Sequence, residues 1–154
     1  MRTLTTLFAF LMLVCLTQPI GAAQTPGKHP GYLHALSDLR MARWYLSHQG
    51  GDSKVYGDEH VAIDEIDAAI AEIKKGSMDD GKDLNDHPKV DVNEHGSRLL
   101  KAMETLHQAH DDISGEEDNP EVRELRHRAL DHIRRAGDAA NRAHAEWLHD
   151  NGKK

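Results

Sequence analysis

The sequence predicts an all-α protein, an up-down-up-down four-helix bundle made of two duplicated helical hairpins. Three observations lead to this prediction: an internal repeat, four segments with helical periodicity, and no long alternation of polar and apolar residues of the kind that indicates a strand. The chain has 154 residues, which suits one domain with a sizeable core.

The internal repeat relates two stretches that lie 67 residues apart. The segment HVAIDEI, residues His60–Ile66, returns as HRALDHI, residues His127–Ile133. Over the 37 positions from Leu33 to Ala69, eleven residues are identical to the residue 67 positions later, where unrelated sequences would give about two or three. We therefore predict that hairpin 30–75 and hairpin 98–150 are two copies of one unit.

The first 23 residues are predicted to be a secretory signal peptide. Arg2 precedes the apolar run Leu7–Leu16, and Gly21–Ala23 supplies small residues for cleavage. The run is too short to span a membrane comfortably, so we expect no membrane span after cleavage. The mature protein is then periplasmic or secreted, and it starts with a polar lead at 24–29.

The composition narrows the classes of function. The only cysteine, Cys15, lies in the predicted signal peptide, so the mature chain offers no disulfide, thiolate metal ligand or cysteine nucleophile. The formal net charge of −7 disfavours nucleic acid as a partner. The chain is histidine-rich, and its twelve histidines supply metal ligands and groups that titrate near neutral pH.

The first hairpin is expected to contain two amphipathic helices. The first begins at Pro30, has apolar residues at alternating spacings of four and three, and ends at Gly50-Gly51. The second starts near Tyr56 and weakens at Lys74-Lys75-Gly76. An acidic linker at 76–97 follows, in which His87-Pro88 argues against a continuous helix.

The second hairpin repeats this pattern. Its first helix has its apolar face from Leu99 to Ile113, and its second opens with Asn119 as the cap and Pro120 as the first helical residue. Eight alanines on one flank of the helices should let neighbouring helices approach closely: Ala35, Ala42, Ala62, Ala69, Ala102, Ala109, Ala129 and Ala136. The four apolar faces should pack together as a bundle.

Four polar residues interrupt the apolar helix faces: Arg43, Glu59, His110 and Arg126. In an up-down-up-down bundle all four would lie near the same pair of loops, so we predict that they form one polar core layer. A contact between Arg43 and Glu59 would offset the cost of burying their charges. Such a layer would fix the register of the helices; a pocket for an anion or small ligand, or a catalytic role, are the alternative interpretations.

Each helix also carries a histidine followed four residues later by an aspartate, a spacing that places both on one helix face. His34 and Asp38 point away from the core and are expected to be solvated. The other three pairs are the candidate metal ligands: His60, Asp64, His107, Asp111, His127 and Asp131. Two pairs could converge where the third helix faces either the fourth or the second. Such ligands suit zinc, copper(II) or nickel, and ordinary surface ion pairing is the alternative.

Signs of catalysis are weak. The elements Glu104-x-x-His107 and Glu124-x-x-His127 are similar to the ligand motif of di-iron bundles, but both glutamates are predicted to point outward. No serine lies in a glycine-framed elbow, and no glycine-rich phosphate loop is present. We therefore expect no enzyme, with a di-iron or haem bundle as the third hypothesis.

Three stretches carry a family resemblance: His29–Arg40, Asp79–Lys82 and Glu116–Asn119. Through them the chain resembles an uncharacterised family of secreted bacterial helical-bundle proteins, which implies the fold and no activity. More loosely, histidines along alanine-rich helices resemble the periplasmic small metal-binding protein, which implies divalent metal binding. We expect an exported, non-enzymatic binding protein for a divalent metal ion; the alternative is a structural or protein-interaction module of the cell envelope with no ligand and an unknown protein partner.

Overall fold

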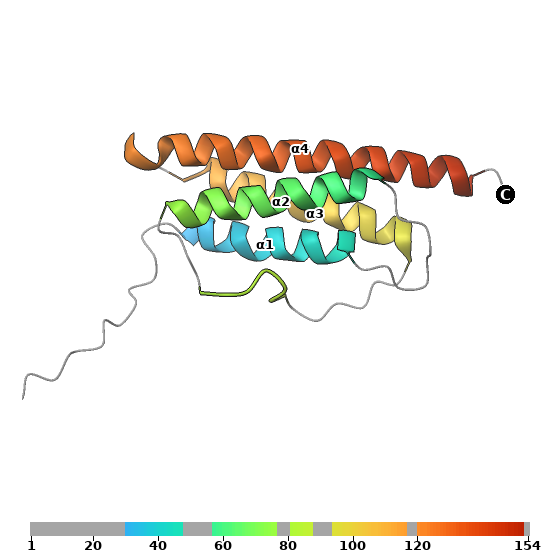
Figure 1. Cartoon of the computed structure of the whole chain (residues 1–154), viewed down its shortest axis with the longest axis horizontal. Coiled ribbons are helices and arrows are strands. Elements are labelled where there is room, and N and C mark those ends of the chain that lie inside the picture. The colour runs from blue at the N-terminus through green and yellow to red at the C-terminus, as the bar shows by residue number, and fades with distance from the viewer. Residues whose placement is uncertain (1–29, 48–56, 77–80, 88–93, 117–119, 153–154) are drawn as a thin grey trace, which may run out of the picture.

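The computed structural model consists of four α-helices (Figure 1). It describes residues 30–47, 57–76, 81–87, 94–116 and 120–152. The helices are α1 (Pro30–Ser47), α2 (Gly57–Lys75), α3 (His95–Ser114) and α4 (Pro120–Asn151). These ranges contain no strand, so the predicted all-α class is confirmed. None of the four helices is long and apolar enough to cross a membrane. The predicted signal peptide and polar lead lie outside the described residues.

Local sequence explains where two of the helices begin and end. Helix α3 starts three residues earlier than expected because the Glu94 carboxylate caps it, accepting hydrogen bonds from the backbone N–H groups of Gly96 at 3.0 Å and Ser97 at 2.6 Å. Helix α2 has acidic residues in its first turn and Lys74 and Lys75 in its last turn. Both sets of charges complement the helix dipole.

Each helix packs against two others. The packed pairs are α1 with α2, α1 with α3, α2 with α4, and α3 with α4. Going around the bundle, the order is therefore α1, α2, α4, α3. Helices α2 and α3, which are consecutive in the chain, lie diagonally across the bundle from each other.

The helix directions differ from the expected up-down-up-down order. Glu59 at the start of α2 bonds His95 at the start of α3, with 2.8 Å between Oε1 and Nε2, so these two helices run parallel. Arg98 near the start of α3 donates to the carbonyl oxygen of Tyr45 near the end of α1. The order is up-down-down-up, which the colours of Figure 1 also show. Gly76 and Glu94 therefore lie at opposite ends of the bundle, and we call the connection between them the crossover.

Residues 67 positions apart, which we call counterparts, occupy related places. Glu65 of α2 and its counterpart His132 of α4 contact each other, with 2.6 Å between Oε2 and Nδ1. A residue meets its own counterpart only near an axis that exchanges the two halves. Antiparallel packing of α1 with α3 and of α2 with α4 fits an approximate twofold axis perpendicular to the helices. Such an axis produces the up-down-down-up order.

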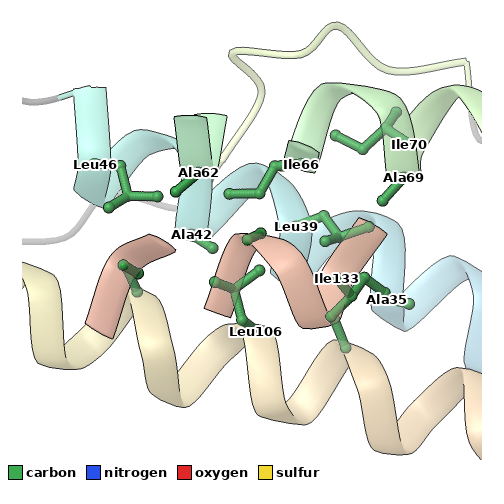
Figure 2. Close-up of a cluster of buried hydrophobic side chains, with 14 of the residues drawn as sticks. Ala35, Leu39, Ala42, Leu46, Ala62, Ile66, Ala69, Ile70, Leu106 and Ile133 are labelled. Carbon is green, nitrogen blue, oxygen red and sulfur yellow. The ribbon is translucent and has the colours of Figure 1, made fainter. Parts of the chain in front are cut away.

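The core is built from counterparts (Figure 2). Leu39 and Leu106 are 0% and 2% exposed, and Ile66 and Ile133 are 0% and 2% exposed. The eight alanines singled out from the sequence are all fully buried. Because the side chain of alanine is a single methyl group, helices that meet at alanines can pack at the short end of the usual range of interaxial distances.

Ion pairs line the seam between α2 and α4. Glu65 bonds both His132 and Arg135, and Glu72 bonds Arg128 at 2.9 Å. Burial alone would raise the pKa of Glu65, but the hydrogen bonds and charges of His132 and Arg135 outweigh it and lower the pKa. These pairs therefore favour the folded state while the carboxylates are ionised.

Candidate functional site

The three predicted metal-ligand pairs lie apart on the surface. His60 and Asp64 are exposed on α2, and His127 and Asp131 are exposed on α4. In the third pair, 3.5 Å separates Nε2 of His107 from Oδ2 of Asp111, and both side chains are exposed. Asp131 instead pairs with Arg134 at 3.6 Å.

Neither expected convergence of pairs occurs. Helices α2 and α3 form no packed pair of the kind that would bring His60 to His107. Helices α3 and α4 do pack, but His107 faces the part of α4 around Arg134 and Gly137, two turns beyond His127. Within the described ranges, no three histidine, aspartate or glutamate side chains gather as a metal site.

The four residues expected in one polar layer are divided between the two ends of the bundle, because α2 and α3 run parallel. Arg43 bonds Asp67 at 2.7 Å instead of Glu59. Glu59 is 2% exposed and bonds His95, which is 6% exposed. The predicted Arg43–Glu59 contact is therefore wrong.

The other two members lie near the opposite end. Arg126 donates to the carbonyl oxygen of Glu116, and His110 lies 3.4 Å from Oδ1 of Asp111 and from Oγ of Ser114. The hydrogen-bond partner of Glu59 is thus His95, at the start of α3, which the repeat did not indicate. The position of His95 just before the predicted third helix was the only sequence signal.

A groove between α3 and α4, which we call the open groove, holds the largest group of predicted site residues. Its volume is about 280 Å³, and all the described residues that line it belong to these two helices. Met103, Leu106 and Ile133 form its apolar part. His107, His110, Asp111 and Arg134 form its polar part, and Gly137 leaves space between them.

Gly137 leaves space at this point of the groove. Among the described residues, a Cβ atom built on Gly137 would meet nothing within 4 Å outside the backbone of its own helix. Its counterpart in the first hairpin, Ile70, is 2% exposed. The second hairpin thus has no side chain at a position where the first has a buried isoleucine.

The polar residues differ in the same way. Between α1 and α2, Arg43 and Asp67 form an ion pair. Their counterparts, His110 and Arg134, both line the open groove and include no carboxylate, so they form no ion pair of this kind. Arg134 is instead held at 3.6 Å by Asp131 and by Asp138, which both belong to its own helix.

Residues 81–87 of the crossover cover the corresponding seam of the first hairpin, and we call the α1–α2 seam together with these residues the covered seam. Lys74 of α2 donates to the carbonyl oxygen of Lys82, and Arg43 of α1 donates to Oδ1 of Asn85 at 3.2 Å. Leu84 packs against the core. The ring of His87 lies 4.9 Å from the ring of Trp44.

A local turn shapes this covering segment. The carboxylate of Asp83 accepts hydrogen bonds from the backbone and side-chain nitrogens of Asn85 at 2.9 and 3.0 Å. The backbone hydrogen bond from Asn85 is the main cause of the lowered pKa of Asp83, and the charges of Arg43 and Lys74 contribute. This turn therefore holds Leu84 against the core and Asp83 near the charges of Arg43 and Lys74.

The elements similar to a di-iron ligand motif point outward, as expected. Glu104 is 54% exposed and pairs with Lys101 at 2.6 Å, and Glu124 is 81% exposed. The two glutamates lie on different helices and do not approach the open groove. They provide no converged carboxylate pair.

Comparisons of the chain with known protein families, with curated proteins and with solved structures find no match. The candidate site is therefore described by its own geometry. It is the open groove, which combines apolar side chains with imidazole and guanidinium groups and corresponds in position to the covered seam of the first hairpin.

Proposed function

We propose that the protein is a non-enzymatic binding module of the bacterial cell envelope, exported by the signal peptide predicted at residues 1–23, and that the open groove is its binding surface. The observation that carries this proposal is the difference between counterparts. The same seam is filled and covered in the first hairpin but lacks both filling and cover by described residues in the second.

We infer that the two hairpins arose as copies of one unit. The repeat in the sequence, the equal burial of Leu39 with Leu106 and of Ile66 with Ile133, and the contact between Glu65 and His132 support this inference. Duplication leaves one copy able to maintain the bundle while the other changes, which agrees with a groove in one hairpin only.

The composition of the groove also supports a binding role. Ligand sites combine an apolar lining with a few placed polar groups, and this groove has three apolar side chains beside two histidines, one aspartate and one arginine.

The test is site-specific photocrosslinking in cells that export the protein. A photoreactive amino acid replaces His107 in the groove or, as a matched control, the exposed neighbour Gln108 on the same helix. We expect one defined adduct from position 107, none from position 108, and loss of the adduct when Gly137→Ile fills the groove. Equal adducts from both positions, or an adduct that Gly137→Ile leaves unchanged, would contradict the proposal.

A divalent cation is the second candidate ligand, favoured by one observation. His107 and His110 lie 3.5 and 3.4 Å from the two oxygens of the Asp111 carboxylate, which places two imidazole groups beside one carboxylate on α3. Imidazole and carboxylate ligands suit zinc, copper(II) or nickel, with water completing the coordination.

Calorimetric titration with these three metals at pH 7.5 and 5.5 tests the cation. Binding should weaken at the lower pH because the histidines become protonated. His107→Gln should remove it, whereas His60→Gln, which alters a solitary exposed pair, should not. Equal binding by both variants would show that the metal binds elsewhere.

A further inference from the structure

The ion pairs between α2 and α4 all have one polarity in a regular row. Three of them recur at intervals of seven residues along each helix, and in each one α2 supplies the carboxylate and α4 the guanidinium group: Asp58–Arg142 at 2.9 Å, Glu65–Arg135 at 3.0 Å and Glu72–Arg128 at 2.9 Å. Seven residues are almost two helical turns, so these groups line up along one side of each helix. We call the three carboxylates the acidic row and the three arginines the basic row.

The two rows determine which hairpins can pack together. Two first hairpins joined through α2 would place one acidic row against another, and two second hairpins joined through α4 would place one basic row against another. Like charges that face each other are destabilising. The arginines are about half exposed, so each ion pair adds little to stability. The rows therefore act mainly on the choice of partner, and a first hairpin accepts only a second hairpin.

The seams between the hairpins are also larger than the seams within them. Helix α2 packs more extensively with α4 than with α1, and α1 packs more extensively with α3 than with α2. The buried hydrogen bond between Glu59 and His95 also joins the two hairpins. A hairpin without its partner would leave its larger apolar seams exposed to water, so each hairpin needs a hairpin of the other kind.

From these observations we propose that a second copy of this chain is a partner for both hairpins, by reciprocal exchange. The first hairpin of each chain packs against the second hairpin of the other, and a twofold axis relates the two identical interfaces. The crossover is the only covalent link between the hairpins. Exchange therefore keeps every contact within a hairpin, including those of residues 81–87 with α1 and α2.

This inference is independent of the binding role proposed for the open groove. Both helices that line the groove belong to the second hairpin, so the exchanged dimer contains two open grooves. If the photocrosslinking experiment failed, the exchange of hairpins would be unaffected, and the reverse also holds.

The protein concentration during folding decides between the single chain and the dimer. In the unfolded chain, a link of this length gives one hairpin an effective concentration on the order of 1 mM near the other. A second chain competes only when its own concentration approaches this value. Once formed, the dimer separates only if both seams open, so it should persist when it is diluted.

The first test is refolding of the chain from urea at two concentrations, with the molar mass measured by light scattering at one common final concentration. Refolding at about 1 mM should give a dimer in an amount comparable with the single chain, and refolding at about 1 µM should give the single chain alone. Single chains alone after both treatments would overturn the inference.

Reversal of the two rows tests whether the dimer forms by exchange. The acidic-row variant carries Asp58→Arg, Glu65→Arg and Glu72→Arg. The basic-row variant carries Arg128→Glu, Arg135→Glu and Arg142→Glu. Each variant alone lacks a hairpin of opposite charge, whereas both interfaces of an exchanged mixed dimer have matched rows. Refolding of the two variants together should give a dimer with one chain of each, which unfolds at a higher urea concentration than either variant alone.

Two controls keep this test decisive. A chain with all six changes restores the ion pairs within one molecule and should fold, which shows that the reversed charges are tolerated. The acidic-row variant refolded with the unchanged chain should give at least about tenfold less mixed dimer, because one of the two interfaces would place arginines against arginines. If the six-change chain folds but the two variants form no mixed dimer, or if the unchanged chain is an equally good partner, the inference is overturned.

Discussion

The two seams that lie within the two hairpins share a backbone arrangement and differ in what fills them. The covered seam has Ile70, the Arg43–Asp67 ion pair and a lid of residues 81–87. The open groove has Gly137, the imidazole of His110 and the guanidinium group of Arg134 in the corresponding places. The difference teaches that two helix pairs with matching buried residues can have a filled seam in one pair and a surface groove in the other when a few side chains differ.

The largest effect is expected from making the covered seam resemble the groove. Ile70→Gly removes a side chain that is 2% exposed and places glycine inside a helix. The cavity and the helix propensity together should destabilise the fold by about 3–6 kcal/mol. Urea unfolding measures the loss.

The reverse change is the control for that comparison. Gly137→Ile introduces a better helix former where a Cβ meets nothing within 4 Å. Its stability should stay within about 1 kcal/mol of the unchanged protein. A loss as large as that of Ile70→Gly would mean that Gly137 is needed for packing and that the groove is not open.

The core at the twofold axis should respond equally in both halves. Leu39→Ala and Leu106→Ala each remove a buried counterpart, and each should cost about 2–5 kcal/mol. Urea midpoints for the two variants should agree closely. If one of these substitutions lowered the free energy of unfolding far less than the other, the two hairpins would not be equivalent.

Removal of the lid should expose the covered seam at moderate cost. Leu84 is partly buried against the core, so Leu84→Ala should destabilise by about 1 kcal/mol. The indole of Trp44 should become more accessible, which its NMR signal and its quenching by acrylamide can report. Asn85→Ala, which removes the acceptor of Arg43, should have the smaller effect. Unchanged Trp44 accessibility in Leu84→Ala would show that residues 81–87 are no lid.

The smallest expected effects are changes of stability with pH. They concern residues on α2 and on α1, the two helices that pack against the second hairpin. The pKa of Glu65, on the α2–α4 seam, is lowered in the folded state. Its stabilising contribution is present above about pH 4.5, its ordinary value, and is lost as the pH falls through the lowered pKa. Glu65→Gln should therefore cost up to about 1 kcal/mol at pH 7 and little at pH 3.

Asp38, on α1, should show the opposite sign. Burial and then the charge of Asp112 raise its pKa, against the smaller effect of His34. A raised pKa favours the folded state at low pH and does so less as the pH rises through it. Asp38→Asn should therefore stabilise by up to about 1 kcal/mol at pH 7 and have no effect at pH 3. Thermal unfolding at the two pH values checks both signs.

Much of the fold could be predicted from the sequence. The helical spacing from Leu99 to Ile113 and the repeated alanines indicated the four helices and their buried faces, because burial imposes a periodic pattern. Helix direction was not predictable in this way. Both direction orders bury the same faces and keep neighbouring helices antiparallel, so the pattern of apolar residues is the same for each.

The length of the crossover was the sequence signal that could have indicated the directions of the helices. The connection from Gly76 to Glu94 has 19 residues, and α2 is 19 residues long, about 28 Å. An extended chain of that length covers the distance easily. The pairing of Glu59 with His95 depends on the resulting parallel arrangement, so the polar layer expected from an up-down-up-down order could not be correct.

The candidate site was predicted only in part. His107, Asp111 and His110 were identified as chemically relevant, and all three line the groove. The importance of Gly137 was missed because a glycine in a helix shows what it leaves open only when its neighbours are placed. The covering role of Leu84 was missed for the same reason, since the acidic linker looks solvated in the sequence.

The most direct test is the rate at which cysteines at the two counterpart positions react with a maleimide, in a chain whose Cys15 is replaced by serine. Gly137→Cys should react within about tenfold of its rate in urea, because the groove is open. Ile70→Cys should react at least about 100-fold more slowly than its own rate in urea, because reaction requires local opening of a covered core position. Equal protection of the two cysteines would contradict the difference between the covered seam and the open groove.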